Sequence, residues 1–353
     1  METDRRLTTN LITLFTSPDI IFQTKRLYVR QFTDADEDNF FRLNSDQDVM
    51  LYIRKVKDRD ESRHFLLENI DAYAKNPMTG RWAVHEKNGD RFVGTFAIIP
   101  LENTSYWQVG YALLKDDWGK GYATELTNTG VQYAFQKMLV SKLTAVTEKS
   151  NHGSMSVLSK TGFTRLENFQ QDGKELCLFE TLNRAVVETD RLLIAALDNR
   201  QLHLYIAANN HLEKELGLKT GDRVLSQDLR EMIDQITVPA MREATETDYY
   251  FYTLWMVIDK TLNRLVAELG FKGMPDETGE IEIGYGTFPL SRGQGYMTEA
   301  VAGMISWARN YPGIKSIKAE TEEDNLPSIR VLEKAGFGII SKHQTRIVWK
   351  YQW

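Results

Sequence analysis

Cysteine is nearly absent from this chain, which limits the cellular compartments and the kinds of metal or thiol chemistry that we expect. The only cysteine is Cys177, so no disulfide can form within the chain. No Cys and His cluster with the spacing of a metal site occurs either, so we expect no metal. A single thiol outside such a cluster indicates a buried structural residue rather than a nucleophile. The low cysteine usage favours the cytoplasm.

Long apolar runs and an excess of basic residues are missing as well. No run approaches the roughly 20 residues of a membrane span, and the apolar stretch at 11–15 is too short for a secretory leader. The formal net charge of −6 argues against a general nucleic-acid binder. We therefore expect neither a membrane nor a nucleic acid as partner. The length of 353 residues predicts two domains.

Two glycine-containing segments stand out in what is present. Segment 291–299, Ser-Arg-Gly-Gln-Gly-Tyr-Met-Thr-Glu, follows a strand-like run at 281–285 and precedes an amphipathic helical pattern. Segment 118–125 repeats this order after the strand-like run that contains residues 109–111. Glycines let the backbone approach an anion closely, and a helix N-terminus offers unpaired N–H groups and a positive dipole end. Each segment therefore predicts a phosphate-binding turn.

The two segments belong to a duplication of the chain. Shifting the sequence by 174 positions aligns residues 110–163 with 284–337 without a gap, and 18 of those 54 positions are identical. The identities include both glycine turns and the closing Gly-Phe pairs. A unit near 170 residues is a domain rather than a solenoid repeat. We predict an N-terminal arm at 1–19, a first domain at 20–183 and a second domain at 184–353.

Local patterns predict similar elements in the two halves. The first half has strand patterns at 24–30, 108–114 and 143–147, a helix pattern at 60–75, a hairpin at 82–99 and a short helix beginning at Asn151. The second half has helix patterns at 201–216 and 226–236, a hairpin at 250–271 and a strand at 281–286. Both halves thus mix helices and strands in the same order.

Each half resembles the GNAT acetyltransferase family, and most of all its ribosomal-protein-alanine N-acetyltransferase branch. The resemblance rests on segments 283–285, 292–299 and 325–337, and in the first half on 109–111, 118–125 and 151–163. It implies an α/β (α+β) class with two tandem domains, each a mixed, mostly antiparallel sheet flanked by helices. It also implies acetyl-CoA as co-substrate, lying where two adjacent strands splay apart.

The resemblance places the pyrophosphate of acetyl-CoA on the backbone N–H groups of both glycine turns. Arginine and lysine side chains there can also donate to a phosphate. The residues expected to bind the cofactor are Tyr285, Arg292, Gly293, Gln294, Gly295, Tyr296, Met297 and Asn325 in the second domain, and Trp118, Gly119, Lys120, Gly121, Tyr122 and Asn151 in the first.

Acyl transfer to an amine needs a base, because a free amine with a pKa of about 10 is mostly charged at neutral pH. Glu282 is the candidate, two residues before Gly284 on the strand that is expected to splay, and Glu280 on the same face is its rival. The alternative for Glu282 is a solvated carboxylate on the outer face. The aligned residue in the first half is Gln108, which cannot act as a base. The second domain is therefore expected to be catalytic.

The departing thiolate needs a proton, and Ser328 is the candidate acid. Many family members have a tyrosine seven residues after the asparagine, but here Leu332 and Leu158 hold that position. The resemblance implies that the serine three residues after the asparagine approaches the sulfur, and Ser328 and Ser154 fit. The alternative for each serine is helix capping.

Glu125 and Glu299 are expected to be structural. A carboxylate in the first helical turn complements the helix dipole, whereas it would repel a phosphate if it pointed toward one.

These patterns predict an N-acetyltransferase that moves acetyl from acetyl-CoA to a primary amine by direct attack in a ternary complex. The alternative is a non-catalytic acyl-CoA-binding or interaction protein on the duplicated scaffold. The acceptor is expected to be a small-molecule or peptide amine, and no motif identifies it. A homodimer and a pairing of the two domains within one chain are both open.

Overall fold

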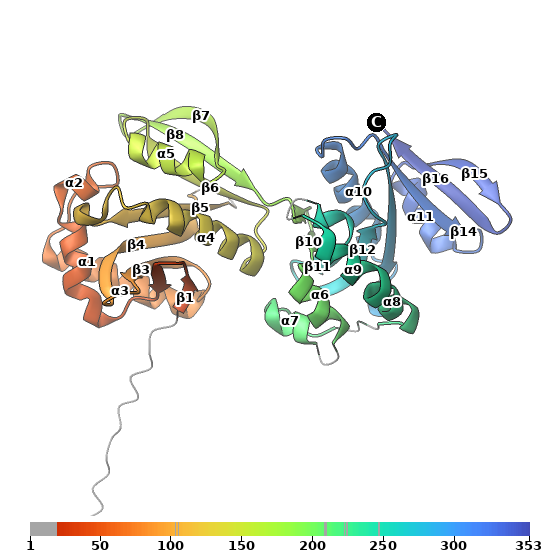
Figure 1. The fold of residues 1–353 in the computed structure, drawn as a ribbon, viewed down its shortest axis with the longest axis horizontal. Coiled ribbons are helices and arrows are strands. Elements are labelled where there is room, and N and C mark those ends of the chain that lie inside the picture. Colours follow the sequence, from red (N-terminus) through yellow and green to blue (C-terminus); the bar gives the residue numbers. More distant parts are fainter. Residues whose placement is uncertain are drawn as a thin grey trace, which may run out of the picture. The chain divides into compact units, whose positions relative to one another are not determined.

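The chain divides into two units, each built on one sheet. The computed structural model describes residues 20–353 except 103, 105, 208–209, 222, 224 and 246–247, so the predicted arm at 1–19 lies outside the described residues. Unit 1 comprises the chain up to Ala134 together with Leu143–Thr181. Unit 2 comprises Phe135–Lys142 and Leu182–Trp353 (Figure 1).

Unit 1 is built on an eight-stranded sheet in the order β1-β2-β3-β4-β5-β6-β8-β7. Strands β5 and β6 are parallel, whereas neighbours from β1 to β5, and β7 with β8, are antiparallel. The strands are β1 (Ile20–Gln23), β2 (Leu27–Arg30), β3 (Gly80–Glu86), β4 (Arg91–Pro100), β5 (Trp107–Leu113), β6 (Lys142–Glu148), β7 (Thr164–Gln171) and β8 (Lys174–Leu182). The helices are α1 (Glu37–Asn44), α2 (Gln47–Met50), α3 (Arg59–Lys75), α4 (Tyr122–Lys137) and α5 (His152–Lys160).

Unit 2 repeats this arrangement in a sheet ordered β15-β16-β14-β13-β12-β11-β10-β9. Its parallel pair is β13 with β14, and the other pairs are antiparallel. The strands are β9 (Val186–Glu188), β10 (Leu192–Ala196), β11 (Leu254–Asp259), β12 (Arg264–Phe271), β13 (Glu280–Thr287), β14 (Ser316–Glu322), β15 (Gly338–His343) and β16 (Arg346–Gln352). The helices are α6 (Asn199–Ile206), α7 (His211–Glu215), α8 (Gln227–Met232), α9 (Val238–Glu243), α10 (Tyr296–Arg309) and α11 (Leu326–Lys334). The predicted mixed, mostly antiparallel sheets are confirmed.

Local chemistry explains where most predicted elements begin and where two predictions are wrong. Helix α3 starts at a capping box formed by Asp58 and Glu61, as the pattern at 60–75 predicts. The predicted helix at 201–216 is instead two helices, because Ala207 after α6 is extended and Asn210 before α7 adopts a left-handed conformation with φ of 53°. The predicted strand at 250–258 begins only at Leu254, since Tyr249–Phe251 form a 3-10 turn.

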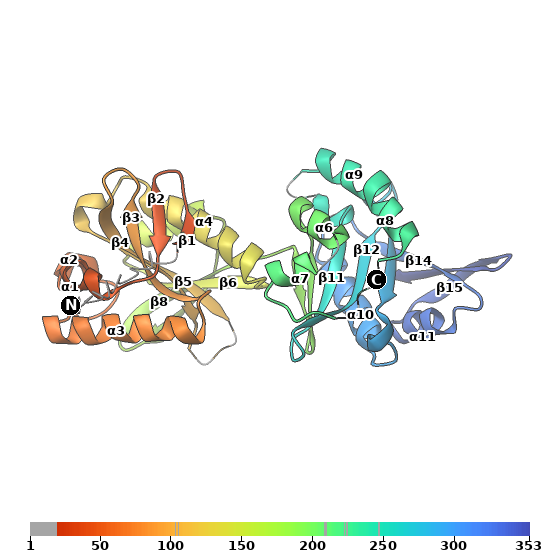
Figure 2. The same cartoon turned by 90° about the horizontal axis from the view of Figure 1, so that it is seen from below.

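Helices cover both faces of the sheet in each unit. In unit 2, α10 packs on a core that includes Val301 and Ile317, and α6 to α9 pack on a second core that includes Leu202 and Ile258. Figure 2 shows α10 on one side of this sheet and α6, α8 and α9 on the other, and it shows α3 and α4 on opposite sides in unit 1. The parallel strand pair thus lies between two helical layers.

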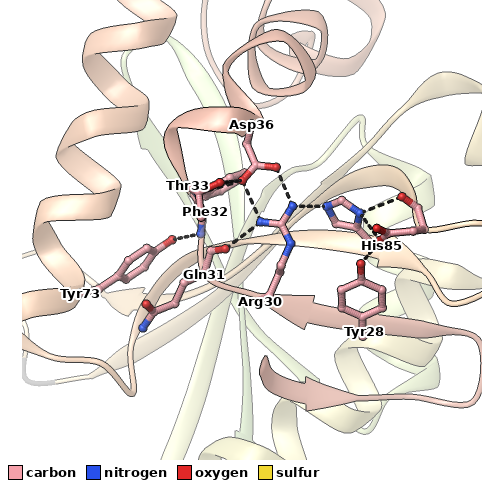
Figure 3. Close-up of polar contacts among 9 residues, drawn as sticks. Tyr28, Arg30, Gln31, Phe32, Thr33, Asp36, Tyr73 and His85 are labelled. Carbon is pink, nitrogen blue, oxygen red and sulfur yellow. Dashed lines mark hydrogen bonds and ion pairs between the residues drawn. The ribbon is translucent and has the colours of Figure 1, made fainter. Parts of the chain in front are cut away.

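A buried polar network ties β2 and β3 to the 3-10 turn at Asp34–Asp36 before α1 in unit 1 (Figure 3). Arg30 donates to both carboxylate oxygens of Asp36 at 2.8 and 2.7 Å and to Nε2 of His85 at 2.9 Å. Nδ1 of His85 faces the carbonyl of Asp90 at 3.2 Å. Because Nε2 accepts from an arginine, the proton of the neutral imidazole is on Nδ1. Burial and then the charge of Arg30 lower the pKa of His85.

Candidate active site

The two parallel strands part at the same point in each unit. Strand β5 pairs with β6 only through Trp107 and Gln108, yet it pairs with β4 as far as Leu113. Strand β13 likewise pairs with β14 only through Glu282 and with β12 as far as Thr287. The backbone groups after Gln108 and Glu282 that face the departing strand therefore lack a ladder partner there. This is the splayed pair that the family resemblance implies.

A left-handed glycine turn follows each splayed strand. In unit 1, Gly119 and Gly121 have φ of 73° and 80°, and α4 begins at Tyr122. In unit 2, Gly293 and Gly295 have φ of 75° and 78°, and α10 begins at the next residue. A Cβ built on Gly119 or Gly293 would meet no atom within 4 Å, so the turn faces open space. These turns fit an anion that lies against backbone N–H groups.

The glutamate in the first turn of each helix is held by the loop between the first two strands of its unit. Glu299 accepts from the Thr189 hydroxyl at 2.6 Å, and from the Arg191 backbone N–H and Nε at 2.9 and 2.6 Å. Glu125 accepts from Thr24 and Arg26 in the same way. Both carboxylates thus bind the helix start to a neighbouring loop, so their role is structural, as predicted.

Side chains around the turns make local hydrogen bonds as well. Trp118 Nε1 donates to the carbonyl of Leu113 at 2.8 Å, and Arg292 Nε donates to that of Thr287 at 3.3 Å, so aligned residues bind aligned carbonyls. Gln294 donates to Leu290. Among the candidates, Lys120 already forms an ion pair with Asp117 at 2.8 Å and would have to leave it to reach a phosphate.

The remaining candidates at the helix starts point their side chains into the protein. The hydroxyl of Tyr122 donates to Glu86 at 2.5 Å, and that of Tyr296 donates to Asp259 at 2.7 Å. Met297 is buried in the core. These three residues can therefore offer a ligand their backbone rather than their side-chain ends.

A serine and a tyrosine meet across the splay in both units. Asn325 Oδ1 caps α11 by accepting from Ser328 N at 3.2 Å, and the Ser328 hydroxyl lies 2.9 Å from that of Tyr285. In unit 1, Asn151 caps α5 in the same way, and Ser154 lies 3.1 Å from the hydroxyl of Tyr111. Burial raises the pKa of Tyr285, so its hydroxyl keeps its proton at neutral pH.

This tyrosine was not predicted as a hydroxyl donor, although both copies are visible in the sequence. The position seven residues after the asparagine, where many family members have a tyrosine, holds the buried Leu158 and Leu332 instead. Burial raises the pKa of Tyr111 to about 12. The identity of Tyr111 and Tyr285 in the 174-residue repeat was the available signal.

Two lysines form ion pairs with Glu282, the predicted base. Glu282 forms ion pairs with Lys272 and, at 3.2 Å, with Lys318, which is its register partner on β14. Its rival Glu280 pairs with Lys350 at 2.7 Å. For Glu282 to receive a proton from an ammonium group, the substrate must take the place of at least one lysine.

A second carboxylate near the splay was missed by sequence reasoning. Glu268 on β12 lies opposite Gly286 on β13 and accepts a hydrogen bond from Tyr205 of α6. Burial raises the pKa of Glu268. In the sequence, Glu268 looks like any alternating residue of a hairpin strand. Only the strand register shows that it lies beside the part of β13 that no longer pairs with β14.

Unit 1 contains a cavity of about 1180 Å³ along its splay. The walls include the glycine turn at Gly119 and Gly121 and the pair of Tyr111 and Ser154. They also include Leu51, Tyr52 and Arg54 from the segment after α2, and Arg81 from β3. The cavity thus extends from the glycine turn to the wall formed by β3 and the segment after α2.

The fold and the site together define a class of protein: a tandem transferase in which a splayed strand pair leads into a left-handed glycine turn at the start of a helix. The model of the acetyltransferase (GNAT) domain matches residues 26–164 and again residues 191–338. The chain therefore belongs to the GNAT acetyltransferase family, as predicted, and carries its domain twice. The members of this family use acetyl-CoA.

Similar proteins match one domain's length. N-acetyltransferase YjdG of Bacillus subtilis (strain 168) is 33% identical over 168 residues, which is 47% of this chain and 97% of that protein. A GNAT-family acetyltransferase structure from Bacillus anthracis has 23% identity and a TM-score of 0.42, covering 46% of this chain and 97% of its own. Ribosomal-protein-S5-alanine acetyltransferase from Vibrio fischeri has 19% identity and a TM-score of 0.40, covering 46% and 96%. In the described part of the chain, no helix is both long and apolar enough to cross a membrane.

Proposed function

We propose that this acetyltransferase transfers acetyl from acetyl-CoA to a primary amine by direct attack within a ternary complex. One observation carries the proposal: in unit 2, β13 parts from β14 at Glu282, and the strand then leads to the left-handed turn at Gly293 and Gly295. A splay admits a linear ligand between strands, and the turn offers N–H groups to its phosphates.

Residues of both turns fit the pyrophosphate of acetyl-CoA. The backbone N–H groups of 292–297 and 118–123 would hold it, because no Cβ fills the space over Gly293 or Gly119. Arg292 is exposed enough to turn from Thr287 toward a phosphate. Bound acetyl-CoA supplies the activated acetyl thioester.

Unit 2 carries the groups proposed to move protons. Glu282 accepts the proton of the acceptor ammonium once that ammonium displaces Lys272, directly or through a water. Ser328 lies across the splay to protonate the departing thiolate, and the hydroxyl of Tyr285 at 2.9 Å can replace the proton that it gives. Glu268 is a second candidate base, because burial raises the pKa of its carboxyl.

Unit 1 shares the splay and the turn but has Gln108 where unit 2 has Glu282. An amide cannot accept a proton at neutral pH, so unit 1 is proposed to bind acyl-CoA without carrying the main activity. The acceptor of unit 2 is a small-molecule or peptide amine.

A thiol-release assay tests this function. The full chain is mixed with acetyl-CoA and a panel of peptides, polyamines, amino sugars and amino acids, and free thiol and acetylated acceptor are both measured. We expect stoichiometric release of both with at least one amine. Tight CoA binding without turnover on any acceptor would instead favour the non-catalytic acyl-CoA-binding protein.

A further inference from the structure

Three cationic side chains surround one aromatic ring in unit 1. The guanidinium carbon of Arg54 lies 4.8 Å from the centre of the Phe65 ring, that of Arg81 lies 5.7 Å away, and Nζ of Lys57 lies 5.3 Å away. Ring contacts of this kind attract one cation. Three around one ring also repel one another, so the cluster needs a further source of stabilisation.

No counter-ion for this cluster occurs among the described residues. Neither Arg54, Lys57 nor Arg81 makes a side-chain hydrogen bond or ion pair with any of them, and Nε of Arg81 is fully buried without a partner. Burial, followed by the charge of Arg54, lowers the pKa of Arg81, and burial lowers that of Arg54. A half-buried guanidinium whose Nε is out of reach of water and has no anion is costly, which identifies this place as one that an anion would stabilise.

The cluster opens into the cavity and is aligned with the splay. Arg81 on β3 is the register partner of Ala97 on β4, which is the partner of Gly110 on β5. The three residues share one face of the sheet, with Arg81 about 10 Å from Gly110 at two strand spacings. Both arginines line the cavity, and a Cβ on Gly110 would meet no atom within 4 Å. Open space and two small residues thus separate the guanidinium from the splay.

The backbone that carries Arg81 is fixed. The hydroxyl of Tyr73 donates to the carbonyl of Arg81 and accepts from the N–H of Phe32 at 3.2 Å. Figure 3 shows Tyr73 reaching Phe32 beside the Arg30 and Asp36 pair. The position of the cation is therefore built into the unit.

Unit 2 lacks this cluster at the equivalent place. The register of β11 and β12 puts Leu254 beside Gly270, so Leu254 holds the position of Arg81, and the adjacent Trp255 matches Trp82. On the same face, Glu268 holds the position of Thr95. Because unit 2 folds with a leucine and a carboxylate there, the fold itself does not require the cations of unit 1.

We propose that the cavity of unit 1 binds a ligand that carries a carboxylate or phosphate, held by Arg54 and Arg81, with the rest of the ligand over Gly110. This goes beyond the proposed activity, since it concerns unit 1 and does not require unit 1 to be catalytic. Arginine pairs hold such planar or tetrahedral oxyanions through several hydrogen bonds at once.

Calorimetric titration of the full chain tests this proposal, with CoA present at saturation so that the glycine turns are already filled. The carboxylate probe is N-acetylglycine, compared with N-acetylglycinamide. The phosphate probe is O-phosphoethanolamine, compared with ethanolamine. We expect at least one anionic probe to bind and its counterpart without the anion to bind at least about tenfold more weakly, because a charge-assisted hydrogen bond is lost. Which of the two anionic probes binds more tightly distinguishes the carboxylate from the phosphate.

Variants locate the binding. Arg81→Met and Arg54→Met should each weaken the anionic probe by roughly tenfold or more, Arg81→Lys should weaken it less, and Arg42→Met on the exposed part of α1 should leave it unchanged. Melting curves confirm that each variant is folded. Equal binding of the anionic and uncharged partners, equal loss with Arg42→Met, or no heat with either anionic probe would overturn the proposal. Thiol release is measured separately, so failure of the activity is distinguishable from failure of this site.

Discussion

Arg191 and Glu299 form an ion pair at 2.6 Å that joins the loop before β10 to the first turn of α10, and Arg26 and Glu125 form its counterpart at 2.7 Å in unit 1. Each arginine also donates to a carbonyl inside the glycine turn, Arg191 to Gln294 at 3.1 Å and Arg26 to Lys120 at 2.9 Å. The pair therefore fixes the turn and the helix start together.

Glu299→Gln should weaken CoA binding and lower stability. The carboxylate accepts three hydrogen bonds from Thr189 and Arg191, and loss of its charge should cost about 2 kcal/mol of unfolding free energy. Thermal melting and CoA titration measure the two effects. Glu125→Gln is the matched variant in unit 1, and it should lower the occupancy of that unit's CoA site instead. Unchanged CoA binding in both variants would show that the ion pair between the arginine and the glutamate does not shape the glycine turn.

Ser291→Asp should stabilise unit 2. Ser291 aligns with Asp117, whose carboxylate binds Arg91 at 2.8 and 2.7 Å in unit 1. In unit 2 the Ser291 hydroxyl and Nε of Arg264, the residue that matches Arg91, are both buried and have no hydrogen-bond partner among the described residues. An added carboxylate should satisfy both positions and raise the unfolding free energy by about 1–2 kcal/mol.

The control for this change is Ser291→Asn, which has nearly the same shape without the charge. Chemical denaturation compares the three proteins. A lower stability for Ser291→Asp than for Ser291→Asn would mean that Arg264 does not reach the new carboxylate.

The His85 network predicts a loss of stability in mild acid. Since burial and Arg30 lower the pKa of His85 in the folded state, the unfolded chain binds the proton more readily. The contribution is full above the unfolded pKa of about 6.5 and is lost as the pH falls through the lower folded value. Melting temperatures from pH 8 to pH 5 should therefore fall more steeply for the wild type than for His85→Gln. Parallel curves would contradict this.

Arg81→Met should leave the ligand-free protein at least as stable as the wild type. Its Nε is buried and has no hydrogen-bond partner in the described part of the chain, and the aligned residue of unit 2 is the buried Leu254. Removing an unpaired buried charge should raise the unfolding free energy by about 1 kcal/mol or more. Denaturant unfolding measures this, and a marked loss would show that Arg81 serves packing.

The sequence predicted the features that depend on local chemistry. The glycine turns, the short helix that begins at Asn151 and the structural role of Glu299 follow from residue types at fixed offsets along one helix start. Because the chain is duplicated, the same pattern supports each of these predictions in both halves. The family and the mixed sheet followed from these segments.

What the sequence did not predict depends on residues far apart along the chain. The two lysines that pair with Glu282 come from the strands on either side of β13: Lys272 directly follows β12, and Lys318 lies on β14. Glu268 reaches the site only through strand register. The cations of unit 1 come from a loop after α2 and from β3 and meet at Phe65 of α3. Spacing along the sequence carries no information about such long-range contacts. The break between α6 and α7 depends on the backbone conformation around Asn210 rather than on a sequence pattern.

The central claim is that unit 2 carries the chemistry of a tandem N-acetyltransferase, and its most direct test compares Glu282→Gln with Gln108→Ala in the thiol-release assay. We predict that Glu282→Gln lowers kcat/KM at neutral pH by roughly 10²- to 10⁴-fold, as for loss of a general base, while Gln108→Ala changes it little. Equal losses in the two variants, or full activity of Glu282→Gln, would contradict the claim.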